Sequence, residues 1–288
     1  MKKFCEKCSS RIYFRCISSL FLSIILLTAL ASAQEKLVLI GGGKRPAEAI
    51  SRFVNWSGKE KARILIITWA SGVPQESFDG IKKDFSTYQI ASFENAPIAP
   101  LSEKAREQFL AQLKTATGVF FTGGDQNRIM DVLKDEMLFQ TLRERYNAGV
   151  VFGGTSAGTA AMSDPMMTGE ADLKTIDGAK VGVRKGLGLL PDSILDQHFI
   201  KRQRENRLFG LILQTPILLG IGIDEDVALL VEDNRRAEVV GETQVMFIDA
   251  HKRKGAMLIH LLKAGERFDL KKRKMISKSK SVTQASAR

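Results

Sequence analysis

Four short, almost entirely apolar runs recur through the first half of the sequence, and helix-like segments separate them. The runs are residues 36–40, 63–68, 118–122 and 149–152. The helix-like segments lie near residues 46–56, 74–86, 102–114 and 127–147. Strands without polar residues on either side are typical of parallel sheets that helices cover on both faces. The pattern therefore predicts an α/β fold, a three-layer α/β/α sandwich around a mostly parallel central sheet.

Beyond residue 217 the apolar runs follow one another more closely. Residues 218–223, 227–231, 237–241 and 245–249 are separated only by short turns. Antiparallel strands can be joined in this way, whereas parallel strands need long crossovers. The sequence therefore predicts a C-terminal β-meander at the edge of the sheet. Residues 34–270 contain no internal repeat and no convincing linker, so we expect one domain there.

The first 33 residues have the features of a secretory signal peptide. A basic segment precedes an apolar stretch from Ile17 to Leu30, and Ala31-Ser32-Ala33 follows as a cleavage site. We expect Gln34 to be the mature N-terminus of an exported, periplasmic or extracellular protein, with no stable membrane insertion after cleavage. An uncleaved membrane anchor is the alternative, but the apolar stretch is short for a bilayer span.

Cysteine usage and charge limit the chemistry of the mature chain. Cys5, Cys8 and Cys16 all lie in the leader, so cleavage would remove every thiol nucleophile, thiolate metal ligand and disulfide. The formal net charge of +11 comes from the leader (+4) and residues 271–288 (+7), which leaves residues 34–270 neutral. This distribution argues against a nucleic-acid-binding domain. We expect the Lys- and Ser-rich residues 271–288 to form a disordered basic tail.

A glycine-rich motif follows the fourth apolar run. Gly154-x-Ser156-x-Gly158 fits the nucleophile-elbow pattern, in which a sharp strand-to-helix turn exposes a serine hydroxyl. The glycines allow the tight turn, and the N–H of Ala157 would then point at a developing oxyanion. An ordinary glycine-rich turn is the alternative, so the motif needs support from the rest of the chain.

A serine nucleophile needs a base, and three histidines follow the leader. His251 lies in a charged turn, and His260 lies in an apolar run that is typical of a core or edge strand. His198 has polar neighbours after a strand-like approach, which makes it the best candidate. A carboxylate should orient its ring, and the choice stays open among the acidic residues after Ile223, namely Asp224, Glu225 and Asp226.

Four segments together carry a family resemblance. They are Phe121-Thr122-Gly123-Gly124-Asp125-Gln126, Gly153-Gly154-Thr155-Ser156-Ala157-Gly158, Asp196-Gln197-His198-Phe199 and Gly222-Ile223-Asp224-Glu225-Asp226. In order and spacing they resemble the cyanophycinases, within the S51 group of serine exopeptidases that includes aspartyl dipeptidase. The resemblance implies a class I glutamine-amidotransferase-like α/β sandwich, with serine in place of the amidotransferase cysteine.

The resemblance also implies roles for individual residues. Ser156 would be the nucleophile, His198 the base and Glu225 the orienting acid, and the N–H groups of Gly124 and Ala157 would form an oxyanion hole. The substrate-binding positions that it implies are Gln126, Asp196, Gln197, Arg202, Arg204 and Arg207. The arginines would otherwise be explained as one charged helix face. No metal and no organic cofactor are implied.

These features favour an exported serine exopeptidase that hydrolyses cyanophycin to β-Asp-Arg dipeptides through an acyl-enzyme. Cyanophycin is a poly-aspartate backbone with arginine on each side-chain carboxyl, and an exported enzyme would scavenge polymer released by other cells. Two alternatives remain, an aspartyl or isoaspartyl dipeptidase and a catalytically silent binding homologue. The resemblance suggests a homodimer.

Overall fold

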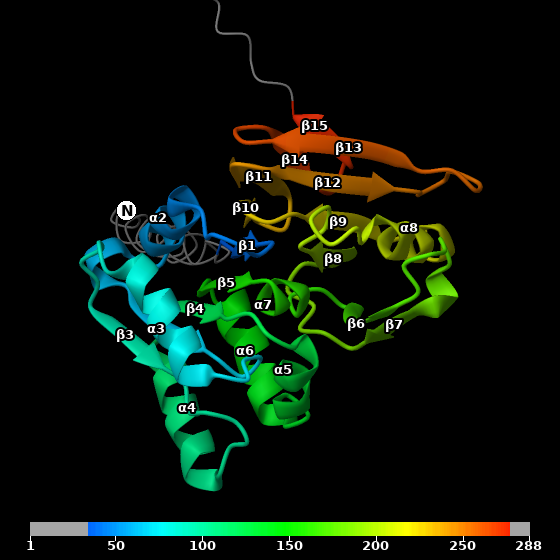
Figure 1. Ribbon diagram of the computed structural model, residues 1–288. Coiled ribbons are helices and arrows are strands. Elements are labelled where there is room, and N and C mark those ends of the chain that lie inside the picture. Colours follow the sequence, from blue (N-terminus) through cyan, green and yellow to red (C-terminus); the bar gives the residue numbers. More distant parts are fainter. Residues whose placement is uncertain (1–33, 277–288) are drawn as a thin grey trace, which may run out of the picture. The chain divides into compact units, whose positions relative to one another are not determined.

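The computed structural model describes residues 34–276, in three sheets with helices between them (Figure 1). The predicted signal peptide, residues 1–33, and residues 277–288 of the predicted tail lie outside this range. The described helices are α2 (Ala47–Trp56), α3 (Pro74–Phe85), α4 (Glu103–Thr115), α5 (Gln126–Val132), α6 (Glu136–Asn147), α7 (Ala157–Ala160) and α8 (Glu205–Gln214). None of them is long and apolar enough to cross a bilayer.

The largest sheet in this range has nine strands and is parallel in one half and antiparallel in the other. Its order is β15 (Lys274–Ile276), β14 (Arg267–Asp269), β11 (Arg236–Gly241), β10 (Val227–Glu232), β1 (Lys36–Ile40), β5 (Val151–Thr155), β4 (Gly118–Phe121), β2 (Arg63–Ile67) and β3 (Ser92–Asn95). The strands from β1 to β3 are parallel, and β10 joins β1 antiparallel. The parallel half contains the four apolar runs, as the sequence predicts.

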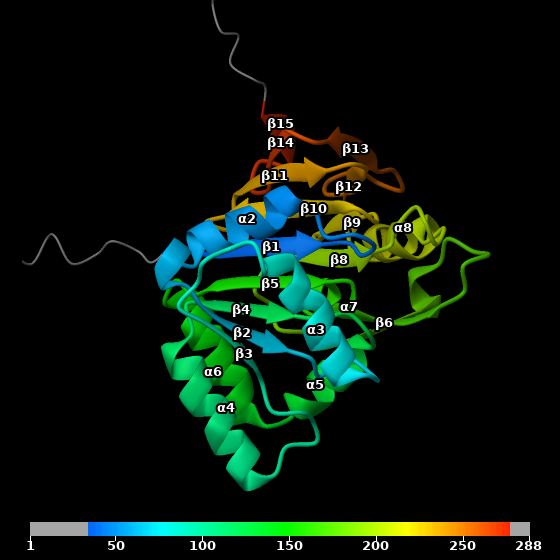
Figure 2. The ribbon, with the colours of Figure 1, turned by 60° about the vertical axis from the view of Figure 1, so that its left-hand side comes forward.

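Helices cover both faces of the parallel half (Figure 2). The side chains of β1 alternate between two apolar clusters, one on each face of the sheet. Val38 and Ile40 belong to the first cluster, with residues of α2 and α3, and Leu37 and Leu39 belong to the second. Helices α4, α5 and α6 contribute to that second cluster. This alternation of buried residues on both sides explains why the strands carry no polar face. The predicted α/β/α sandwich is confirmed.

The closely spaced C-terminal strands divide between two sheets instead of forming one meander. Strands β10 and β11 extend the large sheet, whereas β9 (Leu219–Ile223) and β12 (Gln244–Asp249) pair with each other in a second sheet. That sheet has the order β13 (Leu258–Lys263), β12, β9 and β8 (Ser193–Gln197). Its side chains Ile221 and Phe247 share the core of the large sheet, so both sheets bury their facing sides together.

Three smaller features also differ from the sequence expectations or add to them. The predicted helix near 127–147 is two helices, because Asp135 caps α6 by accepting hydrogen bonds from the N–H groups of Met137 and Leu138. Residues 271–276, assigned to the disordered tail, form a turn and β15, which pairs with β14. A separate hairpin of β6 (Met166–Ala171) and β7 (Val181–Arg184) lies beside α8.

Candidate active site

Ser156 lies at the turn between β5 and α7, at the carboxyl end of the parallel strands. Its backbone has φ 53° and ψ −115°, a strained conformation for a residue with a side chain. A Cβ at Gly154 would lie 2.5 Å from the carbonyl carbon of Gly158, and one at Gly158 would collide with the carbonyl oxygen of Phe121. Glycine is therefore required on both sides of Ser156, and the predicted elbow is present.

His198 follows β8, and its ring lies against the serine hydroxyl. Its Nε2 is 2.8 Å from Oγ of Ser156, and its backbone N–H donates to the carbonyl of Gly41 at 3.0 Å. A Cβ at Gly42 would collide with the imidazole. The glycine loop after β1 thus gives the ring its place in the site. His251 lies exposed in a turn, and His260 lies on the edge strand β13, as expected for histidines outside the site.

Glu225, in the turn between β9 and β10, is the carboxylate that reaches the histidine. Its Oε1 lies 2.6 Å from Nδ1 of His198. Asp224 instead accepts the N–H of Lys201 at 2.9 Å, and Asp226 accepts the N–H of Lys44 at 2.5 Å. The geometry thus selects Glu225, while its two neighbours hold adjacent loops in place.

This arrangement favours the histidine tautomer that a general base needs. With Glu225 accepting the Nδ1 proton, Nε2 is left as an acceptor for the hydroxyl proton of Ser156. Burial lowers the pKa of His198, Arg202 and Arg204 lower it further, and the hydrogen bond that the imidazole donates to Glu225 opposes them. The imidazole is therefore neutral near neutral pH, which is the form that can accept a proton.

The two backbone N–H groups that the sequence suggests for an oxyanion hole belong to Gly124 and Ala157. Gly123 packs against Ser156, since a Cβ there would lie 3.3 Å from Cβ of the serine. Gly124 has φ +136°, and a Cβ there would collide with the carbonyl of Ala70. Within residues 34–276, the N–H groups of Gly124 and Ala157 donate to no other protein atom. Both remain available to a ligand oxygen.

A cleft of about 300 Å³ opens next to the serine. Its lining includes Ser156, His198 and, from α3, Ser77. Arg45 also lines it, with its guanidinium paired with Asp84. Sequence reasoning missed Arg45, although its place just after the glycine loop of residues 41–43 was a usable signal. The cleft therefore includes a guanidinium that already has a carboxylate partner.

The six predicted substrate-binding residues divide into three groups, and none of them lines the cleft. Gln197 lies beside Ser156, with its Oε1 3.4 Å from Oγ of the serine. Gln126 is buried, and its side-chain amide donates to the carbonyl of Met167 on β6 at 2.8 Å. The remaining four are a carboxylate and three arginines around the start of α8, Asp196, Arg202, Arg204 and Arg207.

Asp196 and Arg207 form a buried pair beneath the site. Nε of Arg207 donates to Oδ2 of Asp196 at 2.8 Å, and Nη2 donates to Oδ1. Arg204 donates to the carbonyl of Gln197 at 2.9 Å, and burial together with the charges of Arg207 and Arg202 lowers its pKa to about 10 despite Asp196. Arg202 is exposed. Arg202 and Arg204 thus place positive charge near His198.

The described residues contain no group of three or more His, Cys, Asp or Glu side chains that would hold a metal ion. The chemistry that the site can perform with its own groups is nucleophilic attack by a serine. Ser156, His198 and Glu225 supply a hydroxyl, a proton acceptor and a group that orients this acceptor.

Comparisons with known proteins agree with this chemistry. The chain is 32% identical over 264 residues to a cyanophycinase from Trichormus variabilis, which covers 85% of this chain and 89% of the relative. It is 32% identical over 220 residues to a cyanophycinase from Geminocystis herdmanii, covering 75% and 81% of the two chains. A crystal structure of a peptidase from an acI-B1 Actinobacterium shares the fold, with a TM-score of 0.63 and 23% identity over 83% of this chain and 98% of that one.

The family profile gives the same result. Residues 37–239 match Peptidase family S51, and this range contains the elbow, the histidine and the carboxylate that orients it. The chain therefore belongs to peptidase family S51, and it is a serine-type peptidase.

Proposed function

We propose that this protein is an exported exopeptidase that hydrolyses cyanophycin and releases β-Asp-Arg dipeptides. The observation that carries the proposal is the continuous path from Glu225 through His198 to Ser156, with 2.6 Å and 2.8 Å between the polar atoms. The relatives that match most of the chain are named cyanophycinases, which supports this substrate.

In the proposed reaction, Oγ of Ser156 attacks the carbonyl carbon of the scissile amide while Nε2 of His198 takes the hydroxyl proton. Glu225 stabilises the resulting imidazolium, and the N–H groups of Gly124 and Ala157 donate to the oxyanion. The C–N bond then breaks, and His198 gives its proton to the leaving amine. Water attacks the acyl-enzyme with His198 as base, which frees the carboxylic acid and restores Ser156.

Recognition of the polymer would rely on the charges around the nucleophile. Each unit of cyanophycin carries one free carboxylate and one guanidinium. Arg202 and Arg204 offer cations for the carboxylate, and the side-chain amide of Gln197 lies 3.4 Å from the serine hydroxyl oxygen. Because guanidinium groups bind carboxylates in a planar, bidentate manner, arginine suits this task better than lysine.

Export and assembly are part of the same proposal. Cleavage of residues 1–33 would place the enzyme where polymer from other cells is accessible, and the mature protein would be a homodimer. Expression with the native leader should yield a mature chain that begins at Gln34, which N-terminal sequencing of the exported fraction tests. Light scattering of that fraction tests the dimer, and an unprocessed chain or a monomer would contradict the respective part.

Product identification is the experiment that tests the substrate. Purified mature protein is incubated with cyanophycin, and the soluble products are identified by mass spectrometry. β-Asp-Arg is expected as the main product. Inactivity on cyanophycin with hydrolysis of aspartyl or isoaspartyl dipeptides would assign the site to the dipeptidase alternative. Inactivity on all of them, with no labelling of Ser156 by a serine-directed reagent, would indicate the binding homologue.

A further inference from the structure

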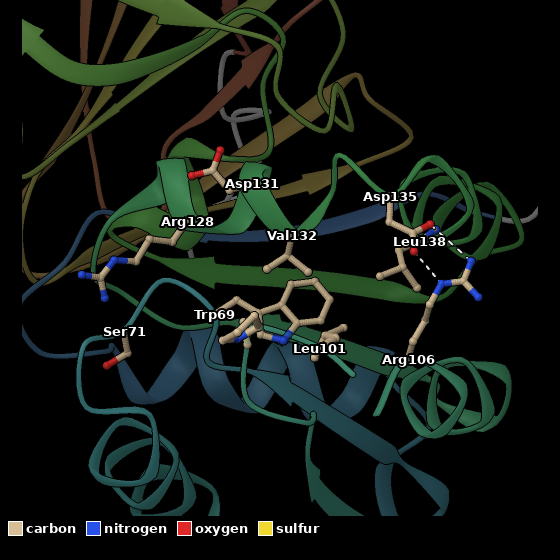
Figure 3. A pocket seen from close by; sticks show the side chains of 11 residues that line it. Trp69, Ser71, Leu101, Arg106, Arg128, Asp131, Val132, Asp135 and Leu138 are labelled. Carbon is tan, nitrogen blue, oxygen red and sulfur yellow. Dashed lines mark hydrogen bonds and ion pairs between the residues drawn. The ribbon is translucent and has the colours of Figure 1, made fainter. Parts of the chain in front are cut away.

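A second cavity of about 480 Å³ is lined in part by Trp69 and Ser71, which belong to the loop that follows β2 (Figure 3). Its lining combines an apolar floor with charged groups at its ends. Trp69, Leu101, Val132 and Leu138 form the floor. The cavity is larger than the cleft at Ser156 and shares no lining residue with it. A floor of this kind suits the methylene groups of a ligand.

An arginine lies at each end of this cavity, and within the described residues only one of the two is free to bind a ligand. At one end, Arg106 is held by Asp135, with its Nε 2.5 Å from Oδ2. At the other end, Arg128 lies near Ser71 (Figure 3). Arg128 is exposed, and its guanidinium makes no hydrogen bond or ion pair with any of the described residues. An anionic group that enters the cavity can therefore bind Arg128 without displacing an existing partner.

The cavity and the cleft share a wall. Ser71 lines the cavity and Ser77 lines the cleft, and their hydroxyl oxygens are 2.7 Å apart. The same loop supports the oxyanion turn, since the carbonyl of Ala70 accepts the N–H of Asp125 at 2.9 Å. Arg128 stands on α5, whose first residue is Gln126. A chain that leaves the cleft over the two serines therefore reaches Arg128.

We propose that this cavity is a distal subsite for the polymer substrate, in which Arg128 binds the carboxylate of an arginyl unit beyond the two units that the scissile bond joins. The inference rests on the proposed function and adds the path of the chain. The cleft of about 300 Å³ is small for more than one dipeptide unit, so the rest of a polymer has to lie outside it. The floor packs against the methylenes of the arginyl side chain.

Binding measurements on an inactive protein test this subsite apart from catalysis. In the Ser156→Ala background, dissociation constants are compared for cyanophycin and for the short oligomer (β-Asp-Arg)2. Arg128→Gln should weaken polymer binding about fivefold more than oligomer binding, the effect of one partly exposed charge pair. Arg128→Lys should recover part of the loss, and Arg128→Glu should enlarge it. Higher ionic strength should reduce these differences.

The matched control is Arg253→Gln, an exposed arginine in the turn between β12 and β13, which should leave both affinities unchanged. If the Arg128 and Arg253 variants bind polymer alike, while the Ser156→Ala protein binds both ligands, the subsite is wrong and the proposed function stands. If that protein binds neither polymer nor oligomer, the proposed function itself fails. Thermal unfolding confirms that each variant is folded.

Discussion

Nδ1 of His198 lies 2.6 Å from Oε1 of Glu225, and this contact joins two loops that are 27 residues apart in sequence. It fixes which ring nitrogen carries the proton and leaves the other one facing Ser156. The orientation of the imidazole therefore depends on a carboxylate from the turn between β9 and β10. Both loops follow strands of the second sheet, and the contact of Nε2 with Ser156 connects them to the end of β5.

Replacing the carboxylate of Glu225 should show how much the orientation of the His198 ring contributes to kcat. Glu225→Gln keeps the size of the side chain but removes its charge and permits the unproductive tautomer. We expect kcat to fall by about 10³- to 10⁴-fold, as in comparable triads. Glu242→Gln, an exposed carboxylate without a side-chain partner in the described range, serves as control and should leave kcat unchanged. Equal turnover of the two variants would remove Glu225 from the mechanism.

The pH dependence should follow the lowered pKa of His198. Only the neutral imidazole accepts the serine proton, so kcat/KM should be lost as the pH falls through this pKa, which lies below the ordinary histidine value. Because the charge of Arg202 contributes to the lowering, Arg202→Gln should raise the pKa and move the acidic limb to higher pH. The measurement is kcat/KM of the Arg202→Gln variant as a function of pH. An acidic limb at the same pH as in the parent protein would contradict the effect of Arg202 on the pKa of His198.

Gly42 should prove to be a positioning residue for the histidine ring. A Cβ at this position collides with the imidazole, and the backbone has φ +133°. Gly42→Ala should therefore lower kcat by about 10²-fold by displacing the base. Gly255→Ala separates collision from backbone strain, since Gly255 has φ +67° but nothing within 4 Å of its added Cβ. The measurement is kcat of both variants. An equal loss of kcat in the two would assign the effect of Gly42→Ala to backbone strain and not to collision with the imidazole.

The buried pair of Asp196 and Arg207 should contribute to stability as much as to activity. Asp196→Ala leaves the guanidinium of Arg207 buried without its partner, which should lower the free energy of unfolding by about 3–5 kcal/mol. Urea denaturation measures this change. Replacing the exposed Arg202 by Gln should leave the stability almost unchanged. An Asp196→Ala protein of native stability with weaker substrate binding would instead show that the carboxylate is free to bind substrate.

The sequence predicts the positions of the strands better than it predicts which strands pair with each other. A strand such as β4 is recognisable because Val119, Phe120 and Phe121 are buried on both faces. The C-terminal runs carry a similar pattern, but nothing in it distinguishes pairing with β1 from pairing in a second sheet. Pairing is decided by the packing of Ile221 and Phe247 against the large sheet. The β15 strand is missed because Lys274 to Ile276 are exposed and mostly held by backbone hydrogen bonds.

The candidate site shows the same division. Ser156 is predictable because the elbow requires glycine at positions 154 and 158, and this spacing is recognisable in the sequence. The choice of Glu225 over Asp224 depends on the direction in which each side chain leaves the turn, and only the structure or a family resemblance supplies it. Arg45 enters the cleft from a loop that is close to Ser156 only after the sheet has formed. From the sequence alone Arg128 is indistinguishable from any other surface arginine, because only the structure shows the cavity that it lines.

The most direct test of the central claim is the rate at which β-Asp-Arg is released from cyanophycin by the Ser156→Ala protein. The nucleophile's hydroxyl is the only group that this change removes, and its site beside α7 tolerates the smaller side chain. Release should fall by about 10⁴-fold or more, with native thermal stability. A folded Ser156→Ala protein that releases the dipeptide at the parent rate would contradict the proposed mechanism.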